Sequence, residues 1–435
     1  GLARMSSEAH TKTPKPEGNP GLMPKRRFPG FSAPWALEPL SRVLTEHKIK
    51  NTAGRDVFSV SMESGIVNQI EHLGRSFAAA DSSHYTIGRR FDVVYTKSPL
   101  KAFPFGVVKQ CKFEGEVALS PLYGVFTPTN PHLGLMIEAY FEAPNRSKTF
   151  LSPLCQKGAK NTLQITNATF LSGRLPLPTQ SAEQQKIAEC LSSVDELIAA
   201  QARKVDALKT HKKGLMQQLF PREGETQPRL RFPEFQNAGE WEEDKLIDIA
   251  TFRRGSFPQP YGLPEWYDEV GGMPFVQVFD VGDDFRLKER TKSKISKLGA
   301  EKSVFIPKGT LIVTLQGSIG RVAITHYDAY IDRTLLIFET FRKPVEKVFF
   351  ARLIQNLFDI EKEIAPGGII KTITKEALSD FKVKLPKIPE QQRIADCLSS
   401  LDALITAQTQ KLAALKTHKQ ALMQQLFPAS EEVAA

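Results

Sequence analysis

One long segment is written twice in this chain. The segment from Glu183 to Pro221 aligns without a gap with the segment from Glu390 to Pro428, at a fixed offset of 207 residues, and 28 of the 39 aligned positions are identical. An internal repeat of this length constrains the architecture more than any local pattern does. The period is far too long for a solenoid, so the sequence predicts two large copies of one unit, each ending in this segment.

Each copy of the repeated segment has the pattern of a long amphipathic helix. Apolar residues recur in a 4,3 heptad rhythm, which is typical of a coiled-coil seam. Pro178 and Pro389 precede the two helices, and Pro221 and Pro428 follow them, as expected at helix boundaries. At about 1.5 Å per residue each helix would span roughly 50–55 Å. The predicted seam consists of Ile187, Leu191, Val194, Ile198, Gln201, Val205 and Leu208, and of Ile394, Leu398, Leu401, Ile405, Gln408, Leu412 and Leu415.

Polar residues interrupt both seams at equivalent positions. Gln201 and Gln408 lie near the middle of their helices, and Lys212 and Lys419 lie further along. In an antiparallel pair, the two glutamine amides could bond reciprocally and fix the register. The alternative is that both glutamines face solvent or a docked partner.

A shorter repeat opens each half of the chain. Arg27-Phe28-Pro29-Gly30-Phe31 recurs as Arg231-Phe232-Pro233-Glu234-Phe235, and Trp35 or Trp241 follows. Two bodies with little sequence similarity lie between the repeated parts: body 1 (residues 32–180) and body 2 (residues 236–388). Both are predicted to be mixed α/β, because short alternating strands occur in each and a helical pattern occurs late in body 2. The clearest predicted elements are strands 91–95, 116–119, 309–315 and 322–325 and a helix over 347–359.

Composition and motifs limit the possible functions. The net charge is +10, and the excess lies mainly outside the long helices, which suits contact with a polyanion without proving it. No run of 18 apolar residues occurs, and the first residues lack the apolar core of a signal peptide. The four cysteines form no CxxC pair and fit reduced thiols, so we expect a cytoplasmic protein with no membrane contact.

Catalytic signatures are missing from the sequence. It contains no GxxxxGK[ST] loop, GxGxxG, GxSxG, HExxH or zinc-type spacing, and no Pro-Pro pair of the kind that amino-methyltransferases carry. Acidic-x-Lys triplets occur at the frequency expected by chance. The sequence therefore favours a binding and assembly protein over an enzyme or a metal site.

Taken together, the chain resembles the specificity subunit of type I restriction–modification enzymes. The resemblance rests on the RFPxF…W motifs, the Glu-Gln-Gln-x-Ile-Ala-x-Cys-Leu-Ser-Ser-x-Asp helix starts, the Lys308–Val313 run, the Gly317–Gly320 turn and the two Leu-Pro exits. It covers nearly the whole chain from Arg27 to Pro428. The helix motif is specific, and the body motifs are weaker.

The resemblance implies a DNA-reading scaffold of mixed α/β fold. Two target-recognition domains would read the halves of a bipartite, asymmetric DNA sequence, and two antiparallel helices related by a pseudo-twofold axis would act as a ruler. Two modification subunits using S-adenosylmethionine for adenine-N6 methylation, and two restriction subunits using ATP and Mg²⁺, would join it, while this chain would bind no cofactor and have no catalysis. The implied segments are a tail (1–24), domain 1 (25–180), helix 1 (181–221), domain 2 (222–388), helix 2 (389–428) and a tail (429–435).

Basic and amide-bearing loops are the candidate DNA contacts. Arg, Lys, Gln and Ser side chains read base edges or hold phosphates, although a charged loop is more often simply solvated. The candidates are Arg89, Arg90, Lys157, Lys160, Arg253, Arg254, Gln316, Ser318, Arg321 and Lys371. Two other functions stay open from the sequence: a self-contained restriction–methylation enzyme, which lacks its motifs here, and a coiled-coil scaffold without DNA, which leaves the two bodies unexplained.

Overall fold

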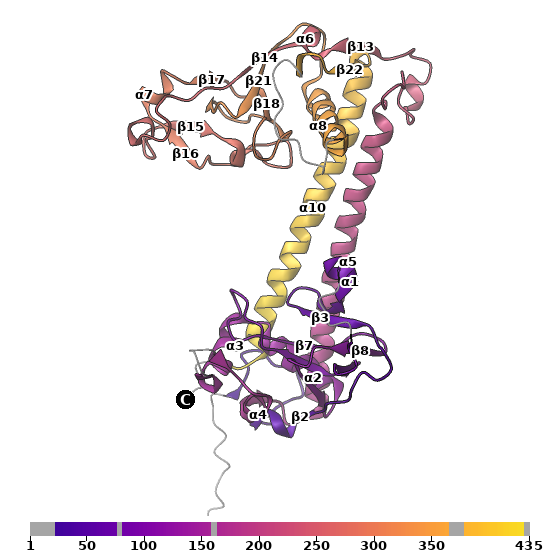
Figure 1. Cartoon of the computed structure of the whole chain (residues 1–435), viewed down its shortest axis with the longest axis vertical. Coiled ribbons are helices and arrows are strands. Elements are labelled where there is room, and N and C mark those ends of the chain that lie inside the picture. Colours follow the sequence, from indigo (N-terminus) through magenta and orange to yellow (C-terminus); the bar gives the residue numbers. More distant parts are fainter. Residues whose placement is uncertain (1–21, 76–80, 158–162, 365–377, 430–435) are drawn as a thin grey trace, which may run out of the picture. The chain divides into compact units, whose positions relative to one another are not determined.

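The computed structural model describes residues 22–75, 81–157, 163–364 and 378–429. Two helices of 39 residues dominate it: α5 (Ser181–Leu219) and α10 (Ile388–Leu426) (Figure 1). The chain forms two compact units. Unit 1 contains the described residues up to Gln201 and from Lys411 onward, and unit 2 contains Ala202–Gln410. Each unit therefore combines one body with the first part of its own helix and the last part of the other helix.

Body 1 contains two four-stranded sheets and two short strand pairs. One sheet has the order β2 (Leu44–Glu46), β9 (Gly124–Pro128), β6 (Val93–Thr96), β7 (Val107–Gln110), and all its neighbours are antiparallel. The other has the order β4 (Gly65–Asn68), β3 (Val57–Ser61), β8 (Glu116–Leu119), β5 (Thr86–Arg89), and its β3–β8 pair is parallel. The strand pairs are β1 (Ala36–Pro39) with β12 (Arg174–Leu177) and β10 (Gln156–Lys157) with β11 (Leu163–Gln164).

Body 2 repeats this arrangement. One sheet has the order β14 (Ala250–Arg254), β21 (Leu335–Phe341), β18 (Leu311–Thr314), β19 (Val322–Ile324). The other has the order β16 (Ser293–Ile295), β15 (Met273–Val276), β20 (Ala329–Ile331), β17 (Val304–Ile306), and again only the central pair, β15–β20, is parallel. Strands β13 (Glu242–Lys245) and β22 (Lys382–Leu385) pair as β1 and β12 do.

The two bodies therefore share one topology although their sequences differ. In chain order, β1 to β9 correspond to β13 to β21, and β12 corresponds to β22. The parallel strand pair shows which residues of the two bodies correspond. Val276 lies opposite Ile331 in β15–β20, and Phe58 lies opposite Leu119 at the same place in β3–β8. The shared topology lets a position in one body be compared with its counterpart in the other.

The remaining helices lie within or beside the bodies. Body 1 contains α1 (Gln69–Leu73), α2 (Pro131–Phe141), α3 (Pro144–Leu151) and α4 (Asn167–Ser172), and body 2 contains α6 (Leu246–Ile249), α7 (Lys297–Ala300) and α8 (Lys347–Ile364). Short 3₁₀ turns span Leu40–Arg42, Ser152–Leu154, Pro233–Phe235, Pro264–Trp266 and Val278–Asp280. Helix α2 begins where Asn130 accepts a hydrogen bond from the Leu133 N–H at 3.0 Å, and Glu346 caps α8 through the Phe349 N–H at 2.6 Å.

The core of each unit joins a body to both long helices. In unit 1, Ile187 and Leu191 near the start of α5 and Phe427 just after α10 belong to the same buried cluster as Trp35. In unit 2, the repeat equivalents Ile394, Leu398 and Phe220 share a cluster with Trp241. Both ends of the repeated segment thus pack into a body core. This packing explains why the segment has an apolar side.

The predicted mixed α/β fold, with two sheet-rich domains and long helices, is confirmed. Strand 116–119 and the shorter observed strands Val93–Thr96, Leu311–Thr314 and Val322–Ile324 match the predicted strands, and the predicted helix 347–359 continues to Ile364. One boundary differs, because α10 already starts at Ile388 and includes Pro389. A proline in the first helical turn is tolerated, since its missing N–H would have no partner there.

Candidate nucleic-acid interface

The opening RFPxF…W motifs hold each body to the start of its long helix. Arg27 donates two hydrogen bonds to the two carboxylate oxygens of Glu183, both at 2.6 Å, and the Trp35 indole N–H adds a third at 3.3 Å. In body 2, Arg231 reaches Glu390 at 2.8 and 2.7 Å, and Trp241 does so at 3.3 Å. Hydrogen bonds to Glu390 raise the pKa of Arg231.

Both glutamates are buried, so each carboxylate requires these donors. The RFPxF…W motifs and the helix starts thus contribute contacts that hold each unit together.

The lysines that interrupt the seams make ion pairs inside each unit. Lys419 of α10 lies 2.7 Å from Asp195 of α5 in unit 1, and Lys212 of α5 lies 2.5 Å from Asp402 of α10 in unit 2. These pairs are repeat equivalents of one another. They show that the helix parts within each unit run in opposite directions, because a residue early in one helix meets a residue late in the other.

Each body adds a charged side chain of its own to this pair. Glu142 of body 1 contacts Lys419 at 2.6 Å and the buried Lys109 at 2.8 Å. Arg352 of body 2 contacts Asp402 at 2.8 Å. Burial raises the pKa of Glu142, but the nearby Lys109 and Lys419 outweigh it and leave that pKa below its usual value. In unit 1 the helix pair therefore contacts an acidic residue of body 1. In unit 2 it contacts a basic residue of body 2.

Every predicted seam residue of the long helices is buried or partly exposed, and none is fully exposed. Ile187, Leu191, Gln201, Val205, Ile394 and Leu398 are buried. The others are partly exposed: Val194, Ile198, Leu208, Leu401, Ile405, Gln408, Leu412 and Leu415. Gln201 and Gln408 belong to different units, so the reciprocal bond between them stays a prediction. His211 and His418 are exposed.

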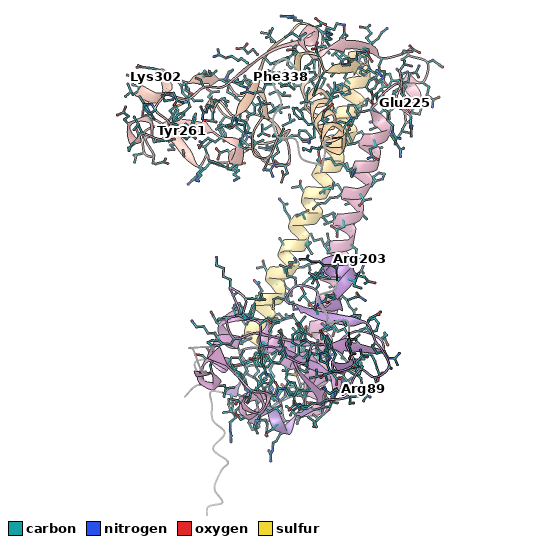
Figure 2. All side chains as sticks on the ribbon, in the orientation of Figure 1. Arg89, Arg203, Glu225, Tyr261, Lys302 and Phe338 are labelled. Carbon is teal, nitrogen blue, oxygen red and sulfur yellow. The ribbon has the colours of Figure 1, made fainter. Side chains whose placement is uncertain are left out.

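In body 1, the predicted contacts Arg89 and Arg90 lie at the turn between β5 and β6 (Figure 2 labels Arg89). Arg89 pairs with Glu116 at 3.1 Å, and Arg90 pairs with Glu114 at 2.6 Å and lies over the Phe91 ring. Both side chains remain about half exposed, at 52% and 47%. Exposed ion pairs of this kind are weak, so a phosphate can compete with either glutamate.

The predicted contacts of body 2 differ in their surroundings. Arg253 and Arg254 end β14 and are exposed. Gln316 and Ser318 are exposed in the β18–β19 turn, where Gly317 has a φ of 65° that favours glycine. Arg321 is partly buried and is held by Asp283 at 2.9 Å, which makes it a structural residue as well as a candidate contact.

The structure does not describe the side chains of three predicted contacts. Lys157 lies in β10, of which the backbone is described. Lys160 and Lys371 lie outside the described residues. The candidates that the structure describes occupy separate turns within their own bodies.

Sequence reasoning missed a polar cluster at the end of the parallel strands of body 2. Tyr261, Gln277 and Arg333 contact one another there through a hydrogen bond and a cation–π contact. No sequence motif marks them, because they come from three separate segments. The parallel pairing that brings their segments together is not encoded in any local pattern.

Within the described residues, no group of three or more His, Cys, Asp or Glu side chains is arranged to hold a metal ion. The same part of the chain contains no helix that is both long and apolar enough to cross a membrane.

Comparison with known proteins finds a matching family for part of the chain. The family described as "Type I restriction modification DNA specificity domain" matches residues 238–417, which cover body 2 and much of α10. The similarity to this family extends over less than half of the chain. The predicted resemblance to type I specificity subunits is confirmed.

Curated proteins similar to this chain include type I restriction enzyme specificity subunits of Methanocaldococcus jannaschii. The MjaX specificity subunit is 25% identical over 276 residues, covering 62% of this chain and 62% of the relative. The MjaVIII specificity subunit is 23% identical over 277 residues, covering 60% and 63%. The chain spans about three fifths of the length of the curated relatives it matches.

Two solved structures share the fold of this chain. A chain from work on complex assembly and conformational transition of the type I R-M system has a TM-score of 0.54 at 17% identity, covering 93% of this chain and 99% of that one. The S subunit from M. genitalium has a TM-score of 0.53 at 13% identity, covering 94% and 100%. At these identities the comparison concerns the fold alone.

Proposed function

We propose that this chain is the DNA-reading specificity subunit of a type I restriction–modification complex. Body 1 reads one half of a bipartite, asymmetric DNA target, and body 2 reads the other half. The chain scaffolds two modification subunits, which methylate adenine N6 with S-adenosylmethionine, and two restriction subunits, which use ATP and Mg²⁺. It performs no catalysis itself and binds none of these cofactors.

The observation that supports this proposal best is the shared topology of two bodies with different sequences. Each body is held by the same Arg–Glu–Trp contact to its helix, and the same ion pair between the two long helices recurs in each unit. The attachment is therefore repeated, while the exposed turns differ between the bodies. Two equivalent modules with different surfaces are what recognition of two different half-sites requires.

The long helices support a fixed spacer between the half-sites. A helix of 39 residues is roughly 58 Å long. One turn of B-DNA is about 34 Å, so a rigid element of this length can span more than one turn. In this proposal the spacer length becomes part of the specificity.

Exchange of body 2 tests the division of labour. Residues 236–388 are replaced with the matching body of a related specificity subunit, and the methylated sites in DNA from cells carrying the complex are sequenced. We expect one half-site to change and the other half-site to stay as it was. A change in both halves would refute the assignment of one half to each body.

Turnover by the isolated chain tests the absence of catalysis. The purified chain is incubated with DNA and S-adenosylmethionine, or with DNA, ATP and Mg²⁺. We expect neither methylation nor cleavage until the partner subunits are added. Turnover by the chain alone would support the self-contained enzyme instead.

A further inference from the structure

The three residues that meet beside the parallel strands of body 2 suggest how this body distinguishes bases. Gln277 follows directly after β15, and Arg333 lies two residues after β20. The two strands leave the sheet at the same end, because Val276 lies opposite Ile331 and the Asp332 N–H donates to the Val276 carbonyl at 3.1 Å.

Tyr261 brings the side chains of Gln277 and Arg333 together. The Gln277 amide donates to the Tyr261 hydroxyl at 3.1 Å, and the Arg333 guanidinium lies 5.5 Å from the centre of the Tyr261 ring. Tyr261 is 50% exposed, so this cluster is at the surface of body 2 (Figure 2). An arginine held over an aromatic ring keeps its planar donor edge in a defined direction.

Packing below the surface fixes the position of Tyr261. Its ring lies 4.7 Å from the ring of Phe257, which is buried and also packs against Phe275 at 5.0 Å. The Trp266 indole N–H donates to the Pro260 carbonyl at 2.9 Å, which ties down the preceding residue. The loop therefore presents Tyr261 in a rigid position, as a reading site needs.

Arg333 is less engaged by carboxylates than Arg89, Arg90 and Arg321. Arg89, Arg90 and Arg321 each pair with a carboxylate. In the described part of the chain Arg333 is exposed and forms no ion pair, and its neighbour Asp332 turns inward to accept hydrogen bonds from Thr334. Its five N–H donors remain available to an acceptor outside the protein.

Body 1 presents different chemistry at the same place. Its equivalent turn follows β8, where the Leu122 N–H donates to the Ser120 hydroxyl as the Thr334 N–H donates to Asp332. No cation stands in that turn, and Leu122 is 75% exposed. The same corner of the fold is thus polar and cationic in one body and apolar in the other.

We propose that Arg333 and Gln277 contact base edges of duplex DNA and determine part of the half-site that body 2 reads, with Tyr261 as the residue that positions both. This inference rests on the proposed function. An arginine can bond the O6 and N7 acceptors of guanine, and a glutamine amide can bond N6 and N7 of adenine. One amide N–H of Gln277 is engaged by Tyr261, and its side-chain oxygen takes part in a capping box with the Asp280 backbone. The second N–H and the second lone pair of the oxygen can face a base.

The experiment is selection of preferred sequences from duplex DNA with a randomised central segment. The full-length chain with its modification subunits selects the DNA, and the wild type is compared with Arg333→Lys and Gln277→Ala. We expect roughly 5- to 150-fold weaker preference at one or two positions of the body 2 half-site for each variant, with the other half-site unchanged. Arg333→Lys keeps the charge but loses the bidentate geometry, so it separates base reading from phosphate binding.

Two further variants sharpen the test. Tyr261→Phe keeps the ring below Arg333 but removes the hydroxyl, so we expect it to relax only the position that Gln277 reads. Arg342→Ala is the matched control, because Arg342 lies just beyond the opposite end of β21 and is also exposed. We expect it to retain the whole recognition sequence.

Specific outcomes would overturn the inference. If Arg333→Ala lowers affinity equally for all sequences and Arg333→Lys restores it, Arg333 is a phosphate contact. If the wild type selects a bipartite sequence and all variants select the same one, the proposed function stands and these residues are not readers. If the wild type selects no sequence at all, the proposed function fails, and this inference fails with it.

Discussion

Single arginines in this chain differ in how strongly they are already bound. Arg89 and Arg90 have carboxylate partners at the surface, whereas Arg253 has no carboxylate partner among the described residues. Exposed ion pairs contribute about 0–1 kcal/mol, so both kinds of arginine can contact a polyanion. The sequence could identify these basic turns, but it could not show which guanidinium groups are neutralised internally.

Substitution of the exposed arginines tests their role in DNA binding. We expect Arg253→Ala combined with Arg254→Ala to weaken binding to DNA of any sequence, because phosphate contacts carry no sequence information. The dependence of the binding constant on salt should become shallower by about one unit for each lost phosphate contact. Fluorescence anisotropy titrations at several salt concentrations measure both effects.

The same titration is applied to Arg89→Ala with Arg90→Ala, and Arg42→Ala serves as a control from a 3₁₀ turn where Arg42 pairs with Glu38. A loss confined to one base position would mean base reading instead of phosphate contact. An unchanged affinity would remove that arginine pair from the interface.

At the scale of elements, charged contacts connect each body to both long helices. Lys419 meets Glu142 and Asp195 in unit 1, and Asp402 meets Arg352 and Lys212 in unit 2. The helix pair presents a lysine and an aspartate in both units, so it can accept either an acidic or a basic side chain from a body. The ion pair between the two helices is repeated in both units. The charged contact that each body adds to this pair differs between the bodies.

Neutralising the partly buried acid of unit 1 should destabilise the chain in a pH-dependent way. Glu142 lies between Lys109 and Lys419 with its side chain 17% exposed, and a hydrogen bond to a charged group contributes about 1.5–3 kcal/mol. Neither lysine is left without an acidic partner when Glu142 is neutralised, because Glu138 and Asp195 still face them. Because the pKa of Glu142 is lowered in the folded protein, its stabilising contribution is present above the pKa of an unfolded glutamate, about 4.3, and is lost as the pH falls through the lower folded value.

The measurement is the urea midpoint of unfolding for Glu142→Gln as a function of pH. We expect a lower midpoint than that of the wild type at pH 7, and a difference that shrinks below about pH 4. Glu116→Gln is the matched control, since Glu116 belongs to exposed ion pairs and should change the midpoint little. A midpoint for Glu142→Gln that matches the wild type at pH 7 would contradict this role.

The elements also show what the sequence could and could not predict. The long helices were predictable, because a heptad pattern and flanking prolines are local signals. The same signals also occur in both copies of the repeated segment. Lys212 and Lys419 could be recognised only as interruptions of the seam, because their partners lie on the other helix at a distance that depends on antiparallel register. The Arg27–Glu183 contact could not be foreseen for the same reason, although both residues stand in recognised motifs.

On the scale of the whole molecule, the repeated segments predicted two copies of one unit, but the strand topology that the two bodies share was hidden from the sequence. Strand order depends on pairings between distant segments, such as β15 with β20, and buried apolar residues can be exchanged freely while the pairing is kept. The bodies have therefore diverged in sequence without a change of topology. The cluster around Tyr261 lies at a pairing of strands that are far apart in the sequence. Motif searches missed it for this reason.

The final prediction concerns how the whole molecule would set the spacing between two half-sites. Gln201 is 8% exposed, Gln408 is partly exposed, and both interrupt the apolar seam at equivalent repeat positions. A shifted helix register would bury a glutamine amide against apolar side chains without a partner, which is costly. We hypothesise that the two glutamines penalise shifted registers and thereby keep the spacer at one length.

The double variant Gln201→Leu with Gln408→Leu tests this hypothesis. We expect a higher melting temperature, because leucine at a seam position gains burial, together with methylation of targets whose spacer is one base pair longer or shorter. Lys212→Leu is the comparison variant, because it also places leucine at a polar seam position but removes a defined ion pair. If the double variant melts at the wild-type temperature and accepts only the original spacer, the glutamines face solvent or a docked subunit, and other contacts set the spacer.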